Sequence, residues 1–165
     1  MDKLAQLWAI EEIKQLKSRY FRLMDTRDFV GMTQVFCRDA VFDCTQGSRI
    51  TPLGGEATGP SGPMVHGREA IMAWISASFA NVTSVHHGHA HEVTIHSETE
   101  AQGIVTMEDY IRSADRGTLL LHAAGHYHER YRVEEGAWRI AATKLTRLFS
   151  DNVGGFASAD KSRGS

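Results

Sequence analysis

The sequence of 165 residues predicts one α+β domain, in which N-terminal helices cover one face of a mostly antiparallel sheet. Three observations support this prediction. Apolar residues recur every three or four positions over residues 4–23, long extended runs fill the second half of the chain, and short turn segments separate those runs. A strongly curved sheet wrapped on helices leaves a cone with an open mouth, a common ligand site. We expect this domain to span residues 1–150, followed by a flexible tail over 151–165.

The first helix is the most clearly marked element. Its apolar stripe consists of Leu4, Leu7, Ile10, Ile13, Leu16, Tyr20 and Leu23. The helix should end near Asp25 to Asp28, where short polar side chains compete for backbone hydrogen bonds. Asp28 can cap a short second helix from Phe29 to about Phe36. A third helix is expected over Arg68 to Phe79.

The extended segments follow from alternation and from turn residues. Residues Ala40 to Thr45 alternate and predict a first strand. Residues 46–66 are rich in glycine and proline, which predicts a long loop that can serve as a lid over a functional site. Four further strands are expected at about 84–96, 100–114, 118–134 and 137–149, joined by hairpin turns.

Composition and charge exclude several classes of protein. The net charge of -2 gives no basic face for a nucleic acid. The longest apolar runs fall far short of the roughly 20 residues that span a bilayer. The first residues lack the apolar segment of a signal peptide, so we expect a cytoplasmic protein in which Cys37 and Cys44 are packed thiols.

Histidine is the unusual component of this chain. Of its nine histidines, four lie between positions 86 and 91, and three more are at 122, 126 and 128. Imidazole has an unperturbed pKa near 6.5, so it can take and give protons at neutral pH. We therefore expect one of them to transfer protons, although most strand histidines are half-buried residues hydrogen-bonded to neighbours.

A metal site is the alternative interpretation of these histidines. His122, His126 and His128 share one face of a predicted strand. Neighbours two apart on a strand point in parallel, so an ion would need a ligand from another strand. The candidates for that ligand are His86, Glu108 and Asp109.

Tyr20 and Asp25 flank the end of the first helix, where a core position and a turn position are their ordinary roles. In an apolar mouth, a tyrosine hydroxyl can also donate to a carbonyl, and a carboxylate can fix the tautomer of an imidazole. Asp109 and Arg147 lie in the strand region, where an ion pair is the simplest interpretation. No Ser-His-Asp order, nucleophile elbow, phosphate loop or zinc-protease motif is present.

The segment from Ile13 to Asp25 (IKQLKSRYFRLMD), followed by Asp28, resembles the opening of SnoaL-like proteins of the nuclear transport factor 2-like superfamily. Further segments fall in that family's order, and together they cover roughly residues 8 to 150. They are Val35-Phe36, Gly67 to Ile71, Val85 to His89, Val93 to Ile95 and Gly136 to Ile140. The pattern of a helix tyrosine, a carboxylate five residues on and a His-x-Gly-His strand is most similar to the bile acid 7α-dehydratases. Scytalone dehydratases and hexachlorocyclohexane dehydrochlorinases are more distant likenesses.

This resemblance implies a site. Tyr20 takes the place of the family's catalytic tyrosine, Asp25 that of its aspartate and His86 that of its histidine. We expect four substrate-binding residues, of which the first and last match family positions: Asp109, His122, Tyr127 and Arg147. The resemblance further implies a cone-shaped α+β barrel, a homotrimer or homodimer, and no metal or organic cofactor.

The chemistry implied is elimination. His86 is expected to remove a proton beside an electron-withdrawing group, Tyr20 to hydrogen-bond the developing oxyanion, and Asp25 to orient the imidazole. We expect a cofactor-independent lyase, with dehydration first, acting on a hydrophobic aromatic or polycyclic small molecule. The alternatives are a carbon–carbon lyase that releases an aldehyde, an isomerase, a polyketide cyclase, and a non-catalytic ligand-binding module.

Two features depart from the family pattern. The segment 46–66 is longer and richer in glycine and proline, and the histidines exceed the usual complement. In a regular strand, Val93 and Ile95 would point to the same face as His87, and His86 would point to the opposite face. A bulge at Gly88 is expected, since only an extra residue turns His86 to the same side as the apolar positions.

Overall fold

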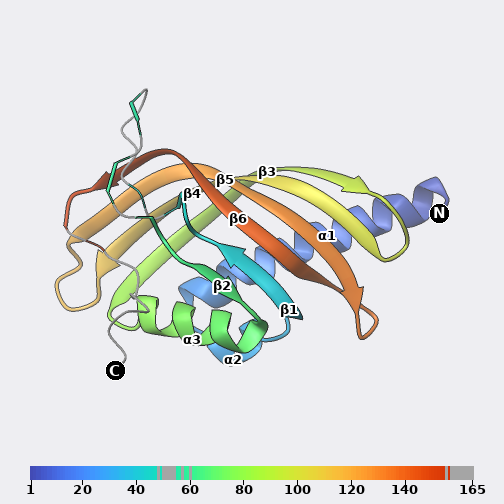
Figure 1. The fold of residues 1–165 in the computed structure, drawn as a ribbon, viewed down its shortest axis with the longest axis horizontal. Coiled ribbons are helices and arrows are strands. Elements are labelled where there is room, and N and C mark those ends of the chain that lie inside the picture. The colour runs from blue at the N-terminus through green and yellow to red at the C-terminus, as the bar shows by residue number, and fades with distance from the viewer. Residues whose placement is uncertain (48, 50–54, 57, 60, 155, 157–165) are drawn as a thin grey trace.

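The computed structural model of the chain describes residues 1–47, 49, 55–56, 58–59, 61–154 and 156. Within these residues two helices are followed by two strands, a third helix and four further strands (Figure 1). In chain order they are α1 (Lys3–Asp25), α2 (Phe29–Met32), β1 (Phe36–Asp43), β2 (Met64–His66), α3 (Arg68–Phe79), β3 (Val82–Ile95), β4 (Glu100–Ser113), β5 (Leu119–Glu134) and β6 (Ala137–Asn152).

The strands form one sheet in the order β2-β1-β6-β5-β4-β3. Strands β3 to β6 are a meander of antiparallel hairpins, whereas β1 runs parallel to β6 and pairs with β2 on its other side. The long strands curve, and α1 runs behind them (Figure 1). The predicted α+β class, with helices on a curved and mostly antiparallel sheet, is therefore confirmed.

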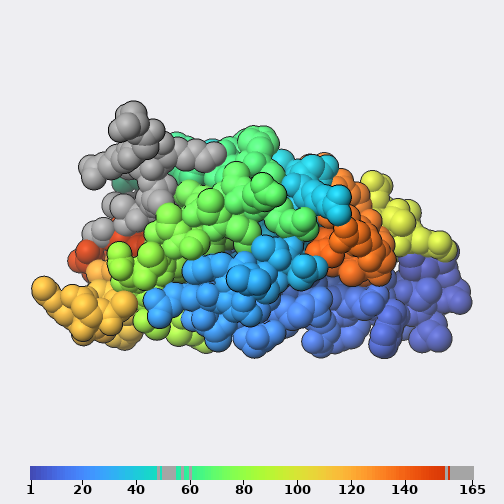
Figure 2. Space-filling view, turned by 90° about the horizontal axis from the view of Figure 1, so that it is seen from below, coloured from blue at the N-terminus to red at the C-terminus, as the bar shows by residue number. Residues whose placement is uncertain are grey.

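The larger of two hydrophobic clusters joins the helices to a single face of the sheet, here called the inner face, and the smaller contains Val82, Ile111, Leu121 and Ala123. Along β5 the buried residues alternate from Leu121 through Tyr127 to Tyr131, and the residues between them point to the opposite, outer face. Helix α1 packs Ile13 and Leu16 on the inner face, and α3 adds its buried side chains to the same core. Helix α2 contacts both α1 and α3, and Figure 2 shows the first turns of α1 at the end of the molecule.

The predicted stripe of the first helix needs a correction at its beginning. Leu4 and Leu7 are 77% and 64% exposed, and burial begins only at Ala9. At about 100° per residue, Leu4 and Leu7 lie on the side of the helix opposite Ile13 and Leu16. Positions three residues apart fall short of a full turn, so the predicted stripe winds around the helix. The first two turns therefore do not contribute to the core.

Two other boundaries differ from the sequence prediction. Helix α2 ends at Met32, and β1 starts at Phe36, four residues before the predicted strand. Within the predicted loop, Met64–His66 pairs with β1 in antiparallel register and forms the edge strand β2. This strand is too short to show alternation, so its pairing was invisible in the sequence.

The bulge expected in β3 is confirmed. The pairing of β3 with β4 shifts register between Gly88 and His91. His86 is consequently buried, while Val93 and Ile95 pack against the same core. A Cβ atom at Gly88 would lie 2.3 Å from a ring carbon of Phe21, so helix α1 can approach the bulge only because the residue is glycine.

The end of the described chain extends past the expected domain boundary at residue 150. Strand β6 continues to Asn152, and the backbone amides of Val153 and Gly154 donate to the carbonyl oxygen of Leu120. Residues 155 and 157–165 of the tail predicted over 151–165 lie outside the described residues. Among the helices of the described ranges, none is long and apolar enough to cross a membrane.

Candidate active site

The two proposed catalytic residues of α1 lie against the meander. Asp25 is the last residue of α1 and Tyr20 lies five residues before it, on the side that packs on the sheet. His86 comes from the buried side of β3. Aromatic contacts connect them, because Phe21 stacks on His86 with ring centroids 6.1 Å apart and packs edge-on against Tyr20 at 5.5 Å.

Asp25 binds the segment around His86 through three hydrogen bonds. Its Oδ1 lies 2.6 Å from His86 Nδ1 and accepts from Ser84 Oγ at 2.9 Å, while its Oδ2 accepts from the backbone amide of His86 at 2.8 Å. An ionised carboxylate can only accept, so the short contact assigns the proton to Nδ1. In the neutral form of this imidazole, Nε2 then carries the lone pair that a general base needs.

A buried ion pair faces that second nitrogen. Arg147 of β6 donates two hydrogen bonds of 2.9 Å to the two oxygens of Asp109 of β4. His86 Nε2 lies 3.9 Å from Asp109 Oδ2. Burial lowers the pKa of Arg147, but the charge of Asp109 and its hydrogen bonds more than offset this and raise the pKa overall. The guanidinium of Arg147 therefore stays charged. It balances the charge of the Asp109 carboxylate that lies near the His86 imidazole.

The hydroxyl of Tyr20 is buried and has no hydrogen-bond partner among the described residues. Burial raises the pKa of Tyr20 well above its ordinary value, and the neighbouring Tyr127 raises it further. The hydroxyl of Tyr127 is not placed to form a hydrogen bond with that of Tyr20. The two rings meet edge to face, with centroids 5.8 Å apart. Tyr20 is thus a neutral phenol with an unused donor, which is costly in a protein interior unless a ligand accepts from it.

A buried charge pair lies beneath these rings and was not anticipated from the sequence. Lys17 Nζ lies 2.7 Å from Glu129 Oε1, and both side chains are fully buried. Its ammonium is 3.5 Å from the centroid of the Tyr127 ring and 4.0 Å from that of Tyr20. Burial lowers the pKa of Lys17, and Glu129 partly offsets this. The signal was available, since Lys17 falls on the buried side of α1.

Glu129 has further partners that keep it in place. Its Oε2 accepts from the Tyr131 hydroxyl at 2.6 Å, and its Oε1 accepts from Thr143 Oγ1 at 3.0 Å. Position 129 has the inward parity of Tyr127 and Tyr131 in β5, so its orientation also followed from alternation. The Lys17–Glu129 pair thus holds the ammonium group against the rings of Tyr20 and Tyr127.

The structure does not bring His122 to this site. Position 122 has the opposite parity to Tyr127 in β5, so its imidazole lies on the outer face, where it contacts Glu108 at 2.7 Å. The other predicted site residues do converge on the inner face. They are Tyr20, Asp25, His86, Asp109, Tyr127 and Arg147.

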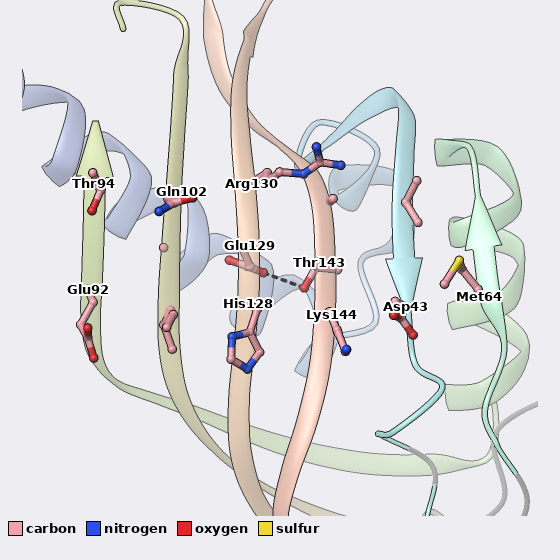
Figure 3. A pocket seen from close by; sticks show the side chains of 14 residues that line it. Asp43, Met64, Glu92, Thr94, Gln102, His128, Glu129, Arg130, Thr143 and Lys144 are labelled. Carbon is pink, nitrogen blue, oxygen red and sulfur yellow. Dashed lines mark hydrogen bonds between the residues drawn. The ribbon is translucent and has the colours of Figure 1, made fainter. Parts of the chain in front are cut away.

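The inner site is closed in this structure. The side chains of His86, Asp109 and Arg147 are only 3%, 3% and 4% exposed. A hollow of about 550 Å³ lies elsewhere, over strands β1 to β6, and includes none of the three proposed catalytic residues (Figure 3). Charged side chains such as Glu92, Arg130 and Lys144 line it. Access of a substrate to His86 therefore requires movement of the side chains that cover it.

One group of potential metal ligands is already close together among the described residues. Ligand atoms of Cys37, Asp39 and Glu134 lie within 4.8 Å of one another. Arg132 contacts both carboxylates, at 2.5 Å and 3.5 Å, so a cation already neutralises them. This group does not adjoin the His86 site.

The comparisons with known proteins agree with this fold. The profile of the SnoaL-like domain matches residues 5–144. The chain belongs to the SnoaL-like family. The solved structures that resemble it share its fold of helices on a curved sheet.

Three solved structures illustrate the similarity. A scytalone dehydratase-like protein from Novosphingobium aromaticivorans has a TM-score of 0.74 and 14% identity, over 99% of this chain and 100% of that chain. A type 2 hexachlorocyclohexane dehydrochlorinase has a TM-score of 0.73 and 15% identity, over 98% and 99%. The ActVI-ORFA protein from Streptomyces coelicolor has a TM-score of 0.62 and 17% identity, over 84% and 96%. At these identities the likeness shows the shared fold.

Proposed function

We propose that this SnoaL-like protein is a cofactor-independent lyase that eliminates water from a hydrophobic aromatic or polycyclic small molecule. The observation that carries the proposal is the contact of 2.6 Å between His86 Nδ1 and Asp25 in a buried site. Two structural relatives are named for a dehydratase and a dehydrochlorinase, which both perform eliminations. Following the family resemblance, the protein is proposed to be a homotrimer or homodimer, and a cytoplasmic location is proposed as well.

The proposed reaction starts at His86. Its Nε2 removes a proton from the carbon beside a carbonyl, and the negative charge moves onto the carbonyl oxygen, where the Tyr20 hydroxyl donates a hydrogen bond. Asp25 stabilises the imidazolium that forms. The electron pair then makes the C=C bond, the C–O bond to the leaving hydroxyl breaks, and the imidazolium returns its proton to that oxygen. One water leaves, and the enzyme is regenerated.

Asp109 and Arg147 are proposed to bind substrate beside His86. Asp109 lies 3.9 Å from Nε2, so it marks where a polar group of the substrate can meet the imidazole. Arg147 can share its guanidinium between Asp109 and an anionic or carbonyl oxygen. Tyr127 completes this wall through its contacts with Tyr20 and Phe21.

Three other reactions start from the same base, so the product decides among them. A retro-aldol lyase, an isomerase and a cyclase all need a positioned imidazole and an oxyanion donor. A non-catalytic binding module has no need for a buried histidine held by two hydrogen bonds to one carboxylate. The geometry of Asp25 therefore favours an enzyme over a binding protein.

The proposal is tested with aromatic and polycyclic β-hydroxy ketones in D₂O, followed by NMR and mass spectrometry. Loss of one water with a new vinyl signal is expected. Tyr20→Phe should reduce this turnover roughly 10²- to 10³-fold, the cost of one oxyanion donor. The stability of this variant should be unchanged or slightly higher, because the buried hydroxyl that it removes has no hydrogen-bond partner among the described residues.

Three of the alternatives leave their own signature in the same experiment. An aldehyde signal identifies carbon–carbon cleavage, and deuterium incorporation without loss of mass identifies an isomerase. If the panel binds, as seen by line broadening, but no compound exchanges a proton or reacts, the lyase proposal is wrong and a binding module is favoured.

A further inference from the structure

The outer face of the sheet holds a second group of titratable side chains that the proposed reaction does not use. It consists of His87 and His89 from β3, Glu108 and Tyr110 from β4, and His122 from β5. We call it the outer histidine cluster. These positions account for three of the histidines that exceed the family's pattern.

Glu108 is the centre of this cluster. Its Oε1 lies 2.7 Å from His122 Nε2, and its Oε2 lies 3.8 Å from His89 Nε2. His87 lies opposite Glu108 in the register of β3 and β4, and its ring centroid is 6.2 Å from that of His89. One carboxylate is thus approached by imidazoles from both neighbouring strands.

The contact between Glu108 and His122 is rigidly supported. Tyr110 stacks on His122 with ring centroids 4.4 Å apart and planes 7° apart. Phe149 packs against the same imidazole in a T-shaped arrangement, with ring centroids 5.2 Å apart. The Tyr110 hydroxyl donates to Glu108 Oε1 at 2.8 Å. Such outer contacts hold ligands in place before an ion arrives, which raises metal affinity.

We propose that His89, Glu108 and His122 form a binding site for a divalent transition metal ion, with Zn²⁺ as the best match to two imidazoles and a carboxylate. Zinc takes such ligands at about 2.0–2.2 Å, which places neighbouring ligand atoms about 3.3 Å apart in a tetrahedral site. Glu108 makes its two contacts through different oxygens, Oε1 to His122 at 2.7 Å and Oε2 to His89 at 3.8 Å. One ligand atom from each of the three residues does not yet lie within 4.8 Å of the other two, so a side chain has to move to close the site. His89 is 54% exposed, so its ring can turn to close the site.

Two other groups on the molecule fit an ion less well. The carboxylates near Cys37 are already neutralised by Arg132. His126 and His128 are neighbours on β5, with ring centroids 6.2 Å apart, but the described contact of His128 Nε2 is the hydroxyl of Thr146 at 3.0 Å. This second pair has no central carboxylate among its described contacts, which makes it a matched control on the same strand and face.

The test is calorimetric titration of ZnCl₂ into the full chain and into three variants. Binding of one zinc ion per chain is expected for the unchanged protein. Glu108→Gln and His122→Asn should each weaken it at least tenfold, whereas the double variant His126→Asn/His128→Asn should stay within about twofold. Cobalt in place of zinc should give the strong visible absorption of a tetrahedral site in the unchanged chain and not in Glu108→Gln.

The outcome is independent of the proposed lyase, because none of these residues lies at His86. Thermal melting checks that each variant is folded, which is expected for substitutions on an exposed face. The proposal is overturned if no saturable binding of one zinc per chain occurs, or if the double control variant loses as much affinity as Glu108→Gln. The second result would mean that the histidines bind zinc without a defined site.

Discussion

Strands β3 to β5 carry a histidine–carboxylate contact on each face, and the two contacts differ in burial rather than in length. On the inner face His86 lies 2.6 Å from Asp25, and on the outer face His122 lies 2.7 Å from Glu108. The His86 side chain is 3% exposed and that of His122 is 28% exposed. Charges interact strongly in the interior and are screened by water at the surface. The inner pair is suited to controlling a proton, and the outer pair to exchanging its partners with solvent.

The largest expected effect separates the two histidines by activity. His86→Gln removes the base and should lower turnover roughly 10²- to 10⁴-fold. The matched outer variant His122→Gln should leave turnover within about twofold, because its ring lies on the other side of the sheet. Steady-state assays with the compound identified in the D₂O experiment measure both. Equal losses in the two variants would contradict the assignment of the inner face as the reaction site.

The second prediction contrasts buried and exposed ion pairs by stability. Lys17→Met leaves Glu129 charged and buried without its partner, so the free energy of unfolding should fall by about 3–5 kcal/mol. Asp39→Ala breaks an exposed pair with Arg132 and should cost about 1 kcal/mol or less. Urea unfolding measures both values. The double variant Lys17→Met/Glu129→Gln should recover part of the loss, and a double variant as unstable as the single one would argue against the unpaired charge as its cause.

The smallest expected effect concerns pH. Burial lowers the pKa of His91, and the nearby charge of Lys17 lowers it further. The unfolded chain therefore takes up a proton near pH 6.5 that the folded chain refuses, so this residue reduces stability as the pH falls below about 6.5. His91→Gln should flatten the acid side of the stability curve between pH 7 and 5. His87→Gln, at an exposed position of the same strand, is the control, and an unchanged slope in His91→Gln would remove His91 as the source.

Much of the fold was readable from periodicity. The long helix, the third helix and the four meander strands each carry a repeat over ten or more residues, and the mismatch of His86 with Val93 located the bulge. Strand β2 and the parallel pairing of β1 with β6 were not readable. A segment of three residues has no period, and alternation within a strand does not say which strand lies beside it.

The site was predictable to a different degree. Tyr20, Asp25 and His86 came from the resemblance of a local motif, and residue types alone suggested only a polar pocket. His122 was placed with the substrate-binding residues although its odd separation from Tyr127 already put the two on opposite faces of one strand. Lys17 and Glu129 each lie on a buried side by periodicity, but the pair was missed because no pattern in the sequence shows that two residues 112 positions apart meet.

The Lys17–Glu129 contact also sets the position of α1 along the sheet. An apolar helix face can slide along a sheet at little cost. If α1 shifted by one turn, about 5.4 Å, both charges would be left buried without a partner. Asp25 lies eight residues beyond Lys17 on the same helix, about 12 Å along its axis. Fixing Lys17 thus sets how far the helix end reaches, so the alignment of Asp25 with His86 is decided by a pair of residues that touches neither.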